Sequence, residues 1–118
     1  MNWTAVGAGL LALAVAMGAF GAHGLRGRID DYSISIYERA VFYHFVHALG
    51  VLIISLLPRP SSTAAWLLVA GIVLFSGSLY VLAVTGIRML GAVTPFGGVA
   101  FIAGWLCLAW SAMRSRQS

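Results

Sequence analysis

The chain has 118 residues, of which 61% are hydrophobic and only 8% carry a charged side chain. With a mean hydropathy of +0.96, this composition excludes an ordinary soluble domain and predicts an integral membrane protein. The formal charge of +4 comes from arginines that lie singly or in pairs, so we expect no nucleic-acid partner and interpret anionic membrane lipids as the counter-charge.

Apolar runs cover nearly the whole chain, and each is long enough to cross a hydrocarbon core that takes about 20 helical residues. They lie at residues 3–25, 36–57, 64–84 and 95–113. The sequence therefore predicts an all-α fold, a single integral membrane four-helix bundle over residues 1–118. Four crossings place both termini on the same side, and the nearly even division of the arginines leaves that side undecided.

The first run is dense in glycine and alanine. Two rows of small residues follow helical spacing, namely Ala8, Ala12 and Ala16, and Ala14, Gly18 and Ala22. Such rows let a second helix approach closely. We therefore expect the first helix to be the central one of the bundle.

A polar connection at residues 26–34 precedes the second run. Ser35 and Glu38 then have the spacing of a capping box, in which the serine hydroxyl and the glutamate carboxylate each accept from a backbone N–H at the helix start. We therefore expect the second helix to be capped by Ser35, with Glu38 in a structural role.

Most of the ionisable side chains lie between His23 and His47, at the end of the first run and the start of the second. At about 100° per residue, Tyr37, His44 and His47 share one face of the second helix. We expect this face to point into the bundle, because imidazoles turned toward lipid lose their hydrogen-bond partners.

A second polar cluster lies on the third run, where Ser76 and Tyr80 are four residues apart on one helical face. Together with the first group it defines a candidate ligand-binding or polar cluster near one membrane surface. The candidate residues are His23, Glu38, Arg39, Tyr43, His44, His47, Ser76 and Tyr80.

Four interpretations of the histidines are open. The first is structural, with each imidazole bonded to a carbonyl or hydroxyl of a neighbouring helix. The second is a metal or haem site whose candidate ligands are His23, His44 and His47, although the fixed spacing of known metal motifs is absent. The third is a proton or substrate path. The fourth is catalysis, which no paired carboxylate, nucleophile elbow or phosphate loop supports, and the sequence requires no cofactor.

Four different motifs follow one another along the chain. They are Gly-Ala-Phe-Gly-Ala-His-Gly-Leu at 18–25, Tyr-His with His-Ala at 43–48, Phe-Ser-Gly-Ser-Leu-Tyr at 75–80, and Thr-Pro-Phe-Gly-Gly with Gly-Trp at 94–105. Taken together, they resemble the domain-of-unknown-function 423 family, small bacterial inner-membrane proteins similar to the eukaryotic transmembrane protein 256. The resemblance implies a four-helix protein of the inner membrane and brings no established activity.

Two function classes follow. The first is a structural or accessory membrane protein that packs against itself, as a homo-oligomer, or against a larger membrane complex. The small-residue rows and the lack of catalytic motifs favour it. The alternative is a small binding or transport module in which His23, His44 and His47 serve a metal, proton, lipid or quinone-like ligand.

Overall fold

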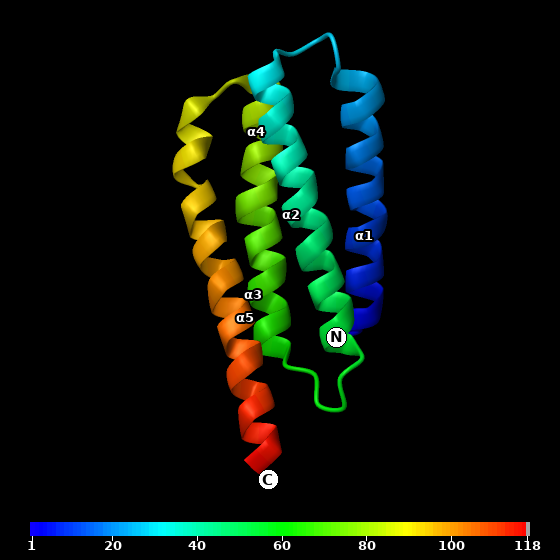
Figure 1. Ribbon diagram of the computed structural model, residues 1–118, viewed down its shortest axis with the longest axis vertical. Helices are drawn as coiled ribbons and strands as arrows, with labels where there is room; N and C mark the ends of the chain where they lie inside the picture. Colours follow the sequence, from blue (N-terminus) through cyan, green and yellow to red (C-terminus); the bar gives the residue numbers. More distant parts are fainter. Residues whose placement is uncertain (118) are drawn as a thin grey trace.

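The computed structural model describes the backbone of residues 1–117 and the side chains of residues 1–114. The described chain is helical almost throughout (Figure 1). Its elements are α1 (Trp3–Phe20), η1 (Gly21–Leu25), α2 (Asp31–Ser55), α3 (Ser62–Gly71), η2 (Ile72–Gly77), α4 (Ser78–Thr85), η3 (Arg88–Ala92) and α5 (Thr94–Gln117). A π-helical turn, η1, extends α1, and a second, η2, joins α3 and α4 into one continuous rod.

Four rods run along the long axis of the molecule, and both termini lie at the same end (Figure 1). The central rod is α2, which packs against α1 on one side and against α3, η2 and α4 on the other. In turn, α5 packs against α3 and η2. The main neighbour of α1 is α2, so the prediction that the first helix is central is wrong.

Small residues occur on more than one face of α1, but only the face toward α2 is packed against another helix. A Cβ added at Gly7 would lie 2.9 Å from the backbone nitrogen of Leu52, which shows how closely α1 and α2 approach. By contrast, the row of Ala8, Ala12 and Ala16 is exposed. Small residues permit a close neighbour on each face but do not supply one.

The start of α2 also differs from the prediction. Its N-cap is Asp30, whose carboxylate accepts a hydrogen bond of 2.7 Å from the backbone N–H of Ser33, and this bond lowers the pKa of Asp30 from its ordinary value of 3.8. The hydroxyl of Ser35 instead donates to the carbonyl of Tyr32. The predicted capping box at Ser35 and Glu38 is therefore wrong, because aspartate is as good an N-cap as serine and occurs earlier in the chain.

Among the described residues, three helical segments are long and apolar enough to cross a membrane. They are Trp3–Leu25, Ser62–Thr85 and Arg88–Arg114. The polar side chains of α2 lower its hydropathy, and α2 is not among these segments. The molecule is thus an all-helical membrane protein in which three of the four predicted crossings are supported by length and composition.

The close packing of α5 against η2 can be tested at two neighbouring glycines of α5. A Cβ added at Gly97 would run into the backbone of Phe75, whereas one added at Gly98 would meet open space. Gly97→Ala should therefore lower the free energy of unfolding by about 1–3 kcal/mol, the usual cost of overpacking.

The matched control is Gly98→Ala, which should leave stability unchanged or raise it by up to ~1 kcal/mol, because alanine favours a helix. Thermal unfolding in one detergent compares the two variants. Equal stability of both would contradict the close approach of α5 to η2.

Candidate functional site

His44 lies where α2 meets α4, and its side chain is only 1% exposed. Its Nδ1 is 2.8 Å from the hydroxyl oxygen of Tyr80, so one hydrogen bond joins the two helices. Its Nε2 is buried and has no hydrogen-bond partner. His44 therefore bonds α2 to α4 through Nδ1 alone.

Two further hydrogen bonds extend this contact. The hydroxyl of Ser76 in η2 donates to the carbonyl of Ala40 over 2.8 Å, and Ser76 is fully buried. The hydroxyl of Tyr37 donates to the carbonyl of Met17 in α1. The rings of Tyr37 and Tyr80 lie 5.1 Å apart. Separate hydrogen bonds thus join α2 to α1 and to the α3–α4 rod.

His47 makes the corresponding contact to α5. Its Nδ1 lies 2.7 Å from the carbonyl oxygen of Tyr43, one turn earlier in α2. Its ring stacks on Phe101, with centroids 3.5 Å apart and planes 14° apart. The ring of Tyr43 is also nearly parallel to that of His47, and the two ring centroids are 5.8 Å apart. This imidazole therefore serves as a flat packing surface between α2 and α5.

The other candidate residues lie at the surface. His23, in η1, is exposed, and so is Arg39. Glu38 is also exposed, and its Oε1 is 3.2 Å from a guanidinium nitrogen of Arg26. The structure thus buries His44, His47 and Ser76 and half-buries Tyr43 and Tyr80 beside them, and it leaves the remaining three candidates exposed.

In the part of the chain that the structure describes, no group of three or more His, Cys, Asp or Glu side chains is close enough to hold a metal ion. His44 and His47 are buried in α2, whereas His23 is exposed in η1. The arrangement that the structure does show is one of hydrogen bonds and ring contacts between helices.

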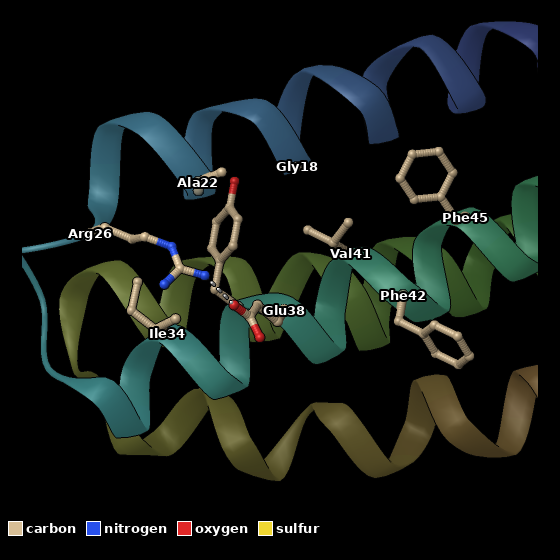
Figure 2. Close-up of a pocket in the computed structure, with 10 residues that line it drawn as sticks. Gly18, Ala22, Arg26, Ile34, Glu38, Val41, Phe42 and Phe45 are labelled. Carbon is tan, nitrogen blue, oxygen red and sulfur yellow. Dashed lines mark hydrogen bonds and ion pairs between the residues drawn. The ribbon is translucent and has the colours of Figure 1, made fainter.

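A groove of about 320 Å³ lies between α1 and α2 (Figure 2). It was not predicted from the sequence. We call it the α1–α2 groove. Its apolar walls include Gly18, Gly21 and Ala22 on one side and Tyr37, Val41 and Phe45 on the other, and Arg26 and Glu38 stand at one end. The row of small residues that contains Gly18 and Ala22 is the sequence feature that could have indicated this groove. Small side chains can leave an open space between two helices as well as let the helices pack closely.

Comparison with known proteins gives a consistent result. The sequence profile described as "Protein of unknown function (DUF423)" matches residues 17–98. The UPF0382 membrane protein YwdK of Bacillus subtilis (strain 168) is 51% identical over 108 residues, which cover 86% of this chain and 88% of that protein. The UPF0382 membrane protein SH2409 of Staphylococcus haemolyticus (strain JCSC1435) is 51% identical over 106 residues, which cover 86% and 87%. No solved structure matches the chain significantly.

The contact between His44 and Tyr80 can be tested by removing one hydroxyl. Tyr80→Phe leaves Nδ1 of the buried imidazole without its partner. The free energy of unfolding should fall by about 1 kcal/mol, between the average of ~0.6 kcal/mol and the maximum of ~1.7 kcal/mol measured for hydrogen bonds between membrane helices.

A matched control is Tyr32→Phe, because Tyr32 is 74% exposed at the start of α2. Denaturation in mixed micelles measures both variants. An unchanged Tyr80→Phe protein, or an equal loss in Tyr32→Phe, would contradict the assigned role of the hydrogen bond.

Proposed function

This chain belongs to the DUF423 family, and we propose that it is a structural or accessory protein of the bacterial cytoplasmic membrane. In this proposal four membrane-spanning helices pack against a larger membrane complex or against copies of the same chain. The observation that carries it is the engagement of both buried imidazoles within the chain.

This engagement has a direct chemical consequence. Nδ1 of His44 is occupied by Tyr80, and Nδ1 of His47 by the carbonyl of Tyr43. The face of His47 is covered by Phe101. A ligand at either Nδ1 would have to displace one of these hydrogen bonds, and the bond between His44 and Tyr80 joins α2 to α4. The same contacts are those expected of residues that bond helices together.

The proposal includes a crossing by α2, for which its length and surroundings provide support. Its 25 residues extend roughly 37 Å at 1.5 Å per residue, more than the ~30 Å of a hydrocarbon core. Asp31, Glu38 and Arg39 lie in its first turns, near the connection to α1. His44 and His47 lie deeper but are buried between neighbouring helices. Polar groups covered in this way are tolerated at membrane depth.

The outer surfaces of the molecule are consistent with an accessory role. In the most apolar 18-residue stretch of Trp3–Leu25, only 17% of the residues are buried inside the molecule. The same fraction is buried in the corresponding stretch of Arg88–Arg114. On α1 the free surface includes the row of Ala8, Ala12 and Ala16. Lipid or another protein must cover these faces, and a row of small residues suits close contact with a second helix.

One observation favours the second candidate function, a small binding or transport module. Nε2 of His44 is buried without a hydrogen-bond partner. Such a group is rare in native proteins and is the kind of atom that a ligand or proton path would use.

Purification from the native membrane in mild detergent distinguishes the two functions. Native mass spectrometry, metal analysis and visible absorption are measured on the wild type, on His44→Gln, and on His23→Gln as the exposed control. The accessory function predicts an assembly heavier than the 12.5 kDa chain, with no stoichiometric metal or chromophore. His44→Gln should lose about 1 kcal/mol of stability, and His23→Gln should lose none.

The opposite result is equally clear. A monomer that carries stoichiometric metal, haem or a small molecule, and that loses it in His44→Gln with the fold intact, would contradict the accessory function.

A further inference from the structure

The α1–α2 groove is apolar along its length and charged only at one end. Its volume of about 320 Å³ is at the lower end of the ~300–1,000 Å³ typical of small-molecule sites. Figure 2 shows Arg26 and Glu38 facing each other across the gap between the helices, with Val41 and Phe45 farther along it. A groove of this kind matches an amphiphile, which has a charged head and an apolar tail.

The mouth of the groove carries one charge of each sign. The Arg26 and Glu38 side chains are 3.2 Å apart and 65% and 61% exposed. An exposed ion pair of this kind is held weakly. Both groups can therefore exchange their mutual contact for charged groups of a ligand at little cost.

The two charges select among lipid headgroups. A purely anionic headgroup bound to Arg26 would lie beside the carboxylate of Glu38, which repels it. A headgroup with a phosphate and a primary ammonium matches both residues, because guanidinium and carboxylate each form charge-assisted hydrogen bonds with an opposite charge. A quaternary ammonium has no N–H to donate to Glu38.

We propose that the α1–α2 groove binds one phosphatidylethanolamine molecule, with its phosphate at Arg26, its ammonium at Glu38 and the start of one acyl chain along the apolar walls. From Glu38 to Phe45 the α2 wall runs seven residues, or roughly 10 Å at 1.5 Å per residue. The groove thus holds the first part of a chain whose remainder lies in the bilayer.

The α1 side of the groove is built in a way that suits this role. Gly21 and Ala22 belong to the π-helical turn η1, and turns of this kind occur often at functional sites. The ring of Tyr37 lies against Gly21, where an added Cβ would collide with it, and its hydroxyl is bonded to Met17. This ring forms a fixed part of the wall. The binding site goes beyond the accessory function and does not depend on it.

Filling the groove tests the site. A Cβ at Gly18 would lie 3.5 Å from Val41, an ordinary contact, so Gly18→Leu places its larger side chain in the groove. The matched control is Gly9→Leu, because Gly9 on the same helix has no heavy atom within 4 Å of an added Cβ. The full chain is incubated with equimolar phosphatidylethanolamine, phosphatidylglycerol and phosphatidylcholine of identical acyl chains, and retained lipid is measured by native mass spectrometry.

Wild type and Gly9→Leu should each retain phosphatidylethanolamine in preference to the other two lipids. Gly18→Leu should retain at least about tenfold less of it, which corresponds to a tenfold weaker Kd. Equal retention by the two leucine variants would overturn the proposal, as would a wild type without headgroup preference.

Headgroup selection is tested on surface residues, which keeps the proposal open to refutation if Gly18→Leu fails to fold. Glu38→Gln removes the partner of the ammonium and should abolish the preference for phosphatidylethanolamine over phosphatidylglycerol. Arg28→Gln is the control, because Arg28 is exposed in the same connection and does not line the groove. An unchanged preference in Glu38→Gln, or an equal loss in Arg28→Gln, would overturn the assignment. Neither result bears on whether the chain assembles with other membrane proteins.

Discussion

The polar side chains on one face of α2 are buried, so their hydrogen-bond partners must come from the chain itself. An unsatisfied buried polar group is costly, and this cost favours helix neighbours that supply partners. Tyr37 finds its partner in α1, and His44 finds one in α4. His47 bonds within α2 and presents its ring to Phe101 of α5. Polar side chains of α2 thus contact α1, α4 and α5.

Glycine sets how closely these neighbours approach. Gly7 lets α1 come against the backbone of α2 at Leu52. Gly97 does the same for α5 against η2 at Phe75, where no side chain fits. In a membrane, where lipid is as apolar as leucine, close packing of this kind is a main source of helix association. The polar contacts choose the neighbours, and the glycines fix the distances.

Much of this arrangement could be predicted from the sequence. Apolar runs of sufficient length predict an all-helical membrane protein, and the family resemblance is confirmed by the profile match at residues 17–98. Helical spacing placed His44 and His47 on one face, and both are buried. These inferences depend only on local periodicity, which the sequence contains directly.

The rest depends on contacts between segments that are distant in sequence. Glycine and alanine rows could not reveal which helix is central, because α1 uses only one of its faces. Asp30 and Ser35 both resemble N-caps, and local spacing could not choose between them. The two π-helical turns give no distinct sequence pattern. The α1–α2 groove arises where two surfaces fail to fill the space between them, which neither surface reveals alone.

We propose that α2 crosses the membrane despite its polar residues, and cysteine accessibility distinguishes this topology from one in which both ends of α2 lie on one surface. After Cys107→Ser, single cysteines are introduced at Arg28, Arg59 and Arg88 and exposed to a membrane-impermeant maleimide on intact spheroplasts. If α2 crosses, Arg28→Cys and Arg88→Cys should react from one side of the membrane and Arg59→Cys only from the other. Labelling of Arg28→Cys and Arg59→Cys from the same side would contradict it, because α2 would then begin and end on one surface.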